Sequence, residues 1–190
     1  MVEEKKETNL VMAGLSFSKT KIAEACSNEK NTTLAIALIA FSVLFATVLA
    51  FFNGNGGNSG FGRDGYIGWQ AAIAEFGSAT IGTFLSAFIM IYVIRIYKVK
   101  LTYPETLRLY GAAIIWTILG TIFGLIPNLG VIGMAVGIAL WLAYNFSLMF
   151  GIAGYTKIKL GQAFLTIVLT FIAVFIVIIL YGMVIGTVFA

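Results

Sequence analysis

Five long apolar segments constrain this chain more than any other feature of its sequence. A helix that crosses a bilayer needs about 20 mostly apolar residues to span roughly 30 Å of hydrocarbon. Backbone N–H and C=O groups in lipid must pair within the segment, which a helix achieves. The sequence therefore predicts an all-α fold, a polytopic membrane bundle of five transmembrane helices. We expect these helices at residues 32–52, 71–97, 105–126, 131–155 and 161–188.

The composition supports insertion into a membrane. Of the 190 residues, 60% are apolar and only 11% are charged, and the mean hydropathy is +0.99. Soluble domains are roughly half apolar and a quarter charged, so a soluble fold of this length would leave much apolar surface in water. We therefore expect a protein that is integral to a membrane.

The basic residues predict the orientation of the bundle. Eleven of the 12 Lys and Arg residues lie before the first span, or in or beside the linkers that follow the second and fourth spans; the exception is Arg63. Cytoplasmic loops are enriched in Lys and Arg, so the N-terminus is expected in the cytoplasm and the C-terminus outside. The same distribution explains the net charge of +4 without a nucleic-acid partner.

The chain is expected to divide into two parts, a cytoplasmic N-terminal segment at residues 1–31 and the five-span domain at residues 32–190. Around residues 18–28 the pattern favours a short helix with apolar side chains on one face. A helix of this kind lies on the inner leaflet of the membrane. A weakly ordered segment is the alternative, and we favour it for residues 1–8.

A glycine-rich loop joins the first and second spans. Residues 60–65, GFGRDG, match the G-x-G-x-x-G spelling of dinucleotide-binding folds. That motif binds pyrophosphate when it follows a strand and opens a helix, whereas this loop is expected to face outward between two membrane helices. A calcium loop would need several carboxylates, and only Asp64 is near. We interpret the loop as a flexible polar cap.

The spans lack the groups on which most enzymes depend. The chain has no His and a single Cys, and none of its eight Asp and Glu residues is expected at the centre of a span. A serine nucleophile in a span would have no evident base beside it. We therefore expect no enzymatic activity, no cofactor and no metal site.

Two polar side chains are candidate intramembrane polar contacts. Asn145 lies deep in the fourth span, where an amide usually bonds to a neighbouring helix for about 0.6–2 kcal/mol. Glu75 is expected near the outer boundary of the second span, at the depth of the lipid headgroups. Because ionisable groups in a bilayer often mark functional sites, a substrate contact is the alternative interpretation.

Small residues recur at four-residue spacing in every span, and such faces let helix backbones approach closely. With the expected orientation most of them lie in the outer half of the membrane, whereas aromatic residues crowd the inner half. We therefore predict a bundle that is tight outside and broader toward the cytoplasm. The alternative is that glycine is simply frequent in membrane helices. The predicted packing glycines are Gly120, Gly124, Gly133, Gly137, Gly182 and Gly186.

The linker before the third span is the best-defined short segment. Thr102 and Glu105 fit a capping box, and Glu105 and Arg108 are about one helical turn apart. A well-formed helix start is the simpler interpretation. The same residues, together with Tyr103 and Tyr110, are the candidate cytoplasmic surface for a partner.

Two stretches of the sequence resemble a known family. The third span opens with TLRLYGAAIIW, and the fourth and fifth spans contain IALWLAYNFSLMFGIAGYTKIKLGQAFLTIVLTFIA. Both stretches resemble the Ypt-interacting-protein (Yip) family of five-span membrane proteins, and the resemblance covers residues 32–188. It implies a cytoplasmic N-terminus, an outward C-terminus and a non-enzymatic role in membrane organisation or trafficking. The sequence is similar to a compact prokaryotic-type member.

The resemblance also bears on partners and location. Eukaryotic members are linked to small Rab-type GTPases and to vesicle traffic between the endoplasmic reticulum and the Golgi. This chain lacks the Asp-Leu-Tyr-Gly-Pro segment of those members, and Ala112 and Ala113 stand where they have Tyr-Ser, which argues against GTPase binding. The expected location is the plasma membrane in a prokaryote and the endoplasmic reticulum or Golgi in a eukaryote.

These observations lead to two main hypotheses about function. The first is a non-enzymatic scaffold or adaptor whose partners would be membrane lipids, other membrane proteins or further copies of the chain. The second is a transporter or channel subunit for a neutral or lipid-like solute, which a continuous or cytoplasm-open cavity lined by Tyr110, Tyr144 and Asn145 would favour. An intramembrane enzyme ranks third.

Overall fold

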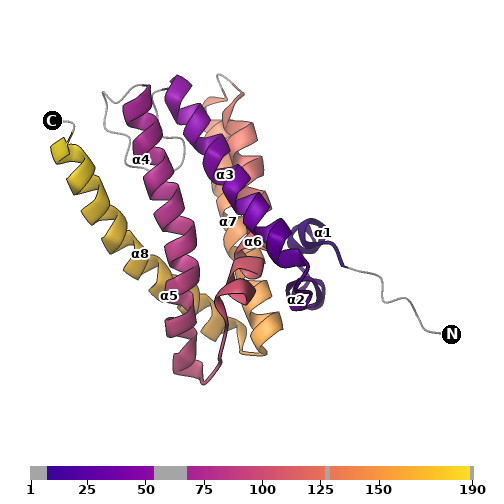
Figure 1. Ribbon diagram of the computed structural model, residues 1–190. Coiled ribbons are helices and arrows are strands. Elements are labelled where there is room, and N and C mark those ends of the chain that lie inside the picture. The colour runs from indigo at the N-terminus through magenta and orange to yellow at the C-terminus, as the bar shows by residue number, and fades with distance from the viewer. Residues whose placement is uncertain (1–7, 54–67, 127–128, 189–190) are drawn as a thin grey trace.

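The computed structural model describes residues 8–53, 68–126 and 129–188, and every regular element in these ranges is a helix (Figure 1). Two short helices precede five long ones. The second long helix is continuous but changes its winding, because α4 passes through a π-helical turn into α5 and ends in a 3-10 turn. The elements are α1 (Leu10–Leu15), α2 (Lys19–Ser27), α3 (Asn31–Asn53), α4 (Trp69–Thr80), η1 (Ile81–Leu85), α5 (Ser86–Val93), η2 (Ile94–Tyr97), α6 (Tyr103–Gly124), α7 (Gly130–Thr156) and α8 (Leu160–Val188).

Five of these helical segments are long and apolar enough to cross a membrane. They are α3, the continuous helix from α4 to η2, α6, α7 and α8. The prediction of an all-α bundle with five transmembrane helices is therefore confirmed. The glycine-rich loop with its motif at residues 60–65 lies outside the described residues, and so do residues 1–7.

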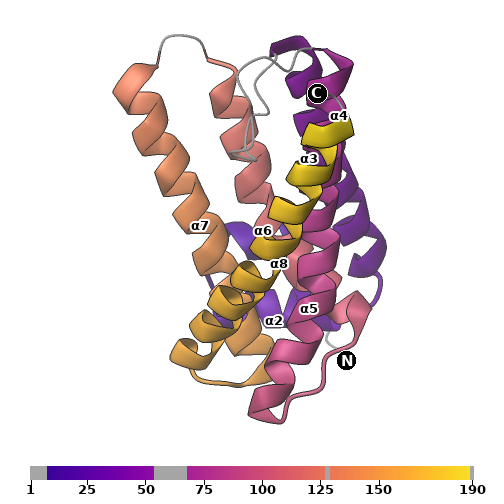
Figure 2. The same cartoon turned by 90° about the vertical axis from the view of Figure 1, so that its left-hand side faces the viewer.

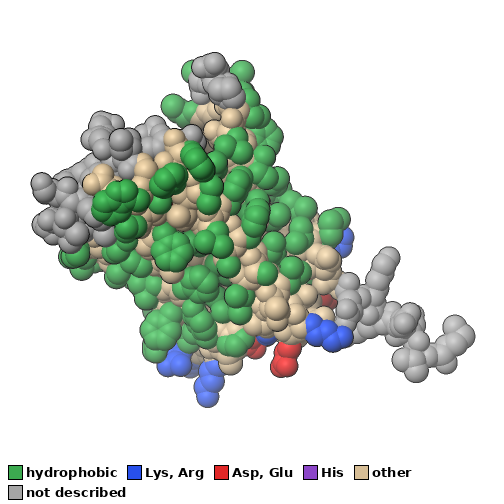
Figure 3. All heavy atoms as spheres, turned by 45° about the horizontal axis from the view of Figure 1, so that its top comes forward, with side chains coloured by type: hydrophobic (Ala, Val, Ile, Leu, Met, Phe, Trp, Pro, Cys, Tyr) green, Lys and Arg blue, Asp and Glu red, His purple; other side chains and the backbone are tan. Residues whose placement is uncertain are grey.

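Basic side chains gather at one end of the bundle, which we call the basic end. The linkers 98–102 and 157–159 lie there, and each begins with a lysine in the left-handed conformation, Lys98 at φ 61° and Lys157 at φ 59°. This conformation closes the preceding helix. Figure 3 shows Lys and Arg side chains along one edge of a surface that is otherwise largely hydrophobic. The other end, where α3 and α6 finish, is the opposite end.

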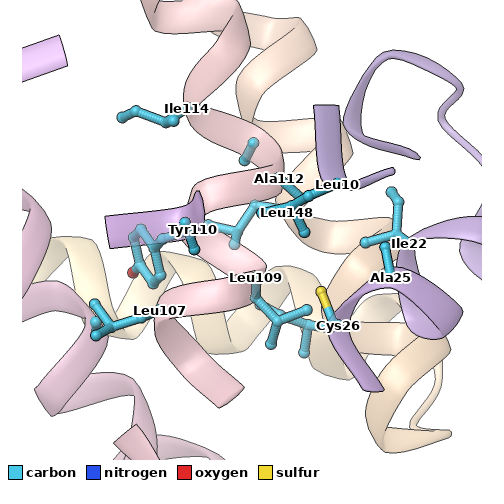
Figure 4. Close-up of a cluster of buried hydrophobic side chains, with 14 of the residues drawn as sticks. Leu10, Ile22, Ala25, Cys26, Leu107, Leu109, Tyr110, Ala112, Ile114 and Leu148 are labelled. Atoms are coloured by element: carbon cyan, nitrogen blue, oxygen red, sulfur yellow. The ribbon is translucent and has the colours of Figure 1, made fainter. Parts of the chain in front are cut away.

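The packed core lies in the half of the bundle nearer the basic end, the basic half. It joins buried side chains from helices that are distant in sequence. Leu10 of α1 and Ile22 of α2 are 0% exposed, and Leu109 of α6 is 1% exposed. Figure 4 shows these side chains beside Cys26 and Leu148. The two N-terminal helices are therefore part of the core.

Glycine residues allow α1 and α2 to lie directly against the bundle. A Cβ atom on Gly14 would overlap the backbone carbonyl of Ala112 in α6, and one on Gly154 of α7 would overlap the backbone carbonyl of Lys19 in α2. The sequence predicted one short helix on the membrane surface or a weakly ordered segment. The structure instead shows two short helices docked on α6 and α7, because glycine removes the side-chain volume that would hold the backbones apart.

The half nearer the opposite end, the opposite half, is packed more loosely. None of the described residues from Val131 to Phe146 in α7 is buried, and neither is any described residue of α8 beyond Val174. Figure 2 shows α7 and α8 separating toward this end. With the predicted orientation, the separation of α7 and α8 is the reverse of a bundle that is tight outside and broader toward the cytoplasm, whereas α3 and α4 stay packed in the opposite half through Ala46, Ala50 and Ala71.

The predicted packing glycines show why the observed packing differs from the predicted packing. Added Cβ atoms on Gly124 and Gly137 would meet nothing within 4 Å, and one on Gly120 would make only ordinary contact at 3.9 Å. A Cβ on Gly133 would meet Leu129, its neighbour along the same helix. For these four, the prediction of close helix contacts within the chain is wrong, because GxxxG spacing does not say which face meets a neighbour. The surroundings of Gly182 and Gly186 lie outside the described residues.

Candidate functional site

A buried arginine in α6 ties the N-terminal helices to the bundle. Arg108 is 5% exposed. Its Nε donates a hydrogen bond to the backbone carbonyl of Cys26 at 2.5 Å, and its Nη1 donates to the Thr32 hydroxyl at 2.7 Å. The Cys26 carbonyl belongs to the last turn of α2, where carbonyl groups lack helical partners and carry the negative end of the helix dipole. Arg108 therefore joins the end of α2 and the start of α3 to α6.

A backbone carbonyl at the end of α1 is likewise hydrogen-bonded by side chains of the bundle. The Gly14 carbonyl accepts hydrogen bonds from Trp116 Nε1 of α6 at 3.2 Å and from the Ser147 hydroxyl of α7 at 3.1 Å. The Phe17 ring stacks on the Trp116 ring with centroids 5.0 Å apart. These contacts were not predicted. The only signal for them in the sequence is that Trp116 and Ser147 each carry a polar atom within a span.

Cys26, whose carbonyl accepts the hydrogen bond from Arg108, is buried and has no disulfide partner. Burial raises the pKa of the Cys26 thiol to about 12, and the nearby positive charge of Arg108 opposes the increase only in part. Because the thiolate is the reactive form, Cys26 is chemically inert while α2 stays docked.

The predicted capping box forms at the start of α6. Glu105 Oε2 accepts hydrogen bonds from the Thr102 backbone N–H at 2.7 Å and from the Thr102 hydroxyl at 2.8 Å. Its Oε1 accepts a hydrogen bond from the Tyr155 hydroxyl of α7 at 2.6 Å. Glu105 thus caps its own helix and also holds the start of α6 against the end of α7, whereas Arg108 directs its Nε and Nη1 to α2 and α3.

The candidate partner residues do not form one exposed surface. Thr102 and Tyr103 are exposed and Glu105 is half-buried, but Arg108 and Tyr110 are buried. The Tyr103 hydroxyl donates to a backbone carbonyl of η1 at 3.3 Å. The prediction of a shared surface is wrong for Arg108 and Tyr110, because α1, α2, α3 and α7 all contact α6 and enclose it.

Two adjoining cavities lie among the membrane helices. The first has a volume of about 320 Å3, and the second about 390 Å3. Tyr110, Tyr144 and Asn145 all line the first cavity, and Tyr144 also lines the second. The structure thus brings together the three side chains that the transporter hypothesis named, but among the described residues it does not show the continuous or cytoplasm-open passage that the hypothesis also asked for. Six residues line both cavities: Gly82, Thr117, Trp141, Tyr144, Phe171 and Ile178.

The π-helical turn η1 forms part of the wall. Gly82 lines both cavities and Thr83 lines the second. The Ser86 hydroxyl, which donates to the Gly82 carbonyl, lines the first. A π-helical turn breaks the regular i→i−4 ladder of the backbone, and such turns are common at functional sites.

The two candidate intramembrane polar contacts both line the cavities. Glu75 is 2% exposed and lines the second cavity, so its side chain faces the interior of the bundle, and its depth at the level of the headgroups stays a prediction. Its helix buries the face that carries Ala71, Glu75 and Ser78, whose spacing fits one side of an α-helix. Asn145 lines the first cavity, but its Nδ2 donates to the Trp141 carbonyl of its own helix at 2.8 Å and not to a neighbouring helix.

The cavities open toward the lipid side of the bundle. Trp141 of α7 and Phe171 of α8 line both cavities, yet they are 59% and 60% exposed. A side chain that lines a cavity and is also exposed marks the mouth of that cavity. The mouth therefore lies between α7 and α8, the two helices that separate in Figure 2.

The described part of the chain contains no group of three or more His, Cys, Asp and Glu side chains that could hold a metal ion. The polar side-chain groups around the cavities are hydroxyl, amide, indole and single carboxylate groups, which can form hydrogen bonds but do not make a ligand cage.

Comparison with known proteins identifies the family. A family model, the Yip1 domain, matches residues 13–182, a range that begins within α1 and ends within α8. Comparisons with curated proteins and with solved structures give no match. The matched range includes α2 as well as the five membrane helices. The chain therefore belongs to the Yip1-domain family, as an integral membrane protein with five helices able to cross a bilayer.

Proposed function

We propose that this protein is a non-enzymatic membrane adaptor whose working surface is its basic end. The observation that carries the proposal is the docking of α1 and α2. Arg108 fixes the end of α2, and the Gly14 carbonyl fixes the end of α1. A partner that binds the basic end would therefore meet a surface that is already shaped, and would not have to order the N-terminal segment.

The basic end has the charge of a surface that binds anionic groups. The buried side of α2 faces the bundle, and its lysines are exposed. A lysine near an anionic membrane surface contributes about 1 kcal/mol of attraction. The proposed partners are the headgroups of anionic lipids together with an acidic face of another membrane protein or of a second copy. The exposed lysines are Lys19, Lys21, Lys30, Lys98, Lys100, Lys157 and Lys159.

We place the basic end in the cytoplasm, since Lys and Arg concentrate on that side of membrane proteins. The membrane would be the plasma membrane of a prokaryote or the endoplasmic reticulum or Golgi of a eukaryote. The absence of the Asp-Leu-Tyr-Gly-Pro segment argues against a small GTPase as the partner.

Photo-crosslinking in intact membranes tests the adaptor proposal. A photoreactive residue replaces Lys21, which is exposed on α2, and in a matched protein it replaces Ile132, which is 68% exposed in α7. We expect protein adducts of defined mass from position 21 and mainly lipid adducts from position 132. The proposal fails if position 21 gives the uncrosslinked monomer and lipid alone, or the same adducts as position 132.

The cavities favour a second candidate, a carrier for a neutral or lipid-like solute. The first cavity contains the hydroxyl groups of Tyr110 and Tyr144 and the amide of Asn145, which suit an uncharged polar ligand. Movement of a fluorescent neutral lipid between the leaflets of proteoliposomes tests this candidate. We expect faster movement than in protein-free liposomes, and an equal rate would exclude it.

A further inference from the structure

We propose that the two adjoining cavities form one binding site for a neutral single-chain amphiphile, a lipid with one hydrocarbon chain and an uncharged, hydroxyl-bearing end. The ligand would enter sideways from the membrane, between α7 and α8. The inference uses the cavity on which the carrier proposal rests, but it concerns binding and does not require movement across the bilayer. It is also independent of the adaptor surface at the basic end.

The first cavity supplies the polar part of this site. Tyr110 is 4% exposed, and it lines the first cavity together with Ser86. The hydroxyl of Tyr144 and the amide of Asn145 belong to the same wall. Hydroxyl and amide groups both donate and accept hydrogen bonds, so they suit the hydroxyl groups of a ligand.

Thr170 of α8 gives independent support for a polar ligand. It lines the first cavity and is 2% exposed, yet within the described residues its Oγ1 has no hydrogen-bond partner. One turn earlier, the Thr166 hydroxyl donates to the Gln162 carbonyl of the same helix at 2.9 Å. Because a buried polar group without a partner is costly, the Thr170 side chain would gain a hydrogen bond by turning its hydroxyl toward a ligand hydroxyl in the first cavity.

The charges of the lining select against an anionic headgroup. Among the described residues of both cavities, Glu75 is the one acidic residue and no Lys or Arg is present. A phosphate or carboxylate of a ligand would therefore be desolvated without a cation beside it. A neutral polar end avoids this cost.

The rest of the lining suits a hydrocarbon chain. Trp141 and Phe171 at the mouth and Ile178, about two turns further along α8, line both cavities. Volumes of about 320 and 390 Å3 each fall in the roughly 300–1,000 Å3 range of small-molecule sites. The polar end would lie beside Tyr110, and the chain would follow α8 toward the mouth.

Photo-labelling of the full chain in nanodiscs tests the inference. The probe is a monoacylglycerol with a photoreactive diazirine in its acyl chain and an alkyne tag. We expect labelled peptides from α7 and α8 around Trp141 and Phe171. Unlabelled monoacylglycerol should compete, whereas the fatty acid of the same chain length should compete at least tenfold less well. Equal competition by the fatty acid would overturn the assignment of a neutral ligand.

Two matched glycine variants locate the site. Added Cβ atoms on Gly137 and Gly124 would both meet nothing within 4 Å, but only Gly137 lines a cavity. Gly137→Leu should fill the first cavity and reduce labelling by roughly tenfold, whereas Gly124→Leu should leave labelling unchanged. Equal labelling of both variants would overturn the site. Tyr110→Phe should weaken competition by monoacylglycerol roughly fivefold without weakening that by the fatty acid.

The outcomes separate this inference from the proposed functions. Labelling that responds to Gly137→Leu, without movement of neutral lipid between leaflets, supports the binding site and excludes the carrier. Crosslinks from position 21 that persist in the Gly137→Leu variant show that the adaptor surface is separate from the cavity. Labelling spread along all five membrane helices would show annular lipid only, and the inference would then be wrong.

Discussion

The two halves of this bundle contain similarly apolar helices but are packed differently. In α7, Leu148 and Ile152 of the basic half are 2% and 0% exposed, whereas none of the described residues from Val131 to Phe146 in the opposite half is buried. In lipid an apolar side chain gains little by contacting another helix, because lipid chains are equally apolar. Apolar sequence therefore places a helix in the membrane without deciding how closely it packs.

Polar contacts and glycine approaches explain the difference. The basic half contains the hydrogen bonds of Arg108, Glu105 and the Gly14 carbonyl, and the close backbone approaches at Gly14 and Gly154. In the opposite half, the Tyr181 hydroxyl of α8 donates to the Ile73 carbonyl of α4 at 3.1 Å. The half that has directional contacts is closed, and the half that has few leaves space for the cavities.

Removal of the buried Arg108 should have the largest effect on the difference in packing between the two halves. Arg108→Ala removes two charge-assisted hydrogen bonds and should lower the free energy of unfolding by about 3 kcal/mol. The docked α2 should loosen, so N-ethylmaleimide should modify Cys26 rapidly in nanodiscs. Arg95→Ala, which changes an exposed arginine, is the control and should leave Cys26 protected. Equal protection of Cys26 in both variants would contradict the role of Arg108.

A pair of glycine variants compares the halves directly. Gly14→Ala places a methyl group on the Ala112 carbonyl and should cost about 2 kcal/mol of stability. Gly124→Ala enters open space and should be neutral or stabilise by up to about 1 kcal/mol through its helix propensity. Thermal unfolding in nanodiscs measures both. If Gly124→Ala destabilises as much as Gly14→Ala, the opposite half is packed as closely as the basic half.

Two tyrosine variants make the same comparison for hydrogen bonds. Tyr155→Phe removes a hydrogen bond to the Glu105 carboxylate and should lower the free energy of unfolding by about 1 kcal/mol. Tyr181→Phe removes one to a neutral carbonyl and should cost about 0.5 kcal/mol. The exposed Tyr92→Phe is the reference. A larger loss for Tyr181→Phe than for Tyr155→Phe would reverse the proposed ranking of the halves.

The smallest effect is the loss of stability near pH 9. The pKa of Cys26 is raised from its ordinary value of 9.0 to about 12, so the folded state holds the thiol proton more tightly than the unfolded state. The resulting stability is complete well below pH 9 and is lost as the pH rises toward about 12; the loss is only about 0.4 kcal/mol at pH 9 and grows by about 1.4 kcal/mol per pH unit above it. Cys26→Ala should show a shallower decline of thermal stability over this range. Identical profiles for both proteins would contradict burial of the thiol.

The five long helices and the start of α6 could be predicted because their causes are local. Length and apolarity decide whether a segment spans a bilayer, and the capping box between Thr102 and Glu105 needs only residues three apart. The residues of the first cavity, Tyr110, Tyr144 and Asn145, were also named together from the sequence, because polar atoms are rare in spans.

The docking of α1 and α2 and the contrast between the halves could not be predicted. Gly14 stands alone in a six-residue helix, without a repeated spacing, and its role depends on the Ala112 carbonyl 98 positions later in the chain. The regular pairs, such as Gly133 and Gly137, attracted the prediction and do not bring helices together. Spacing along one helix does not specify its partner, since the partner is set by rotation and tilt in three dimensions.

The π-helical turn η1 has a consequence for insertions and deletions. It accommodates five residues per hydrogen-bonded step where an α-helix has four, and each residue turns a helix by about 100°. Deletion of one residue between Ile81 and Leu85 would let the turn relax to regular winding, and the segment with Glu75 and Ser78 would keep its orientation relative to α5. Deletion of one residue from the regular winding on either side would instead rotate that segment by about 100° and turn its polar face away from the cavities. This turn can thus absorb a change in residue number that the rest of the helix cannot.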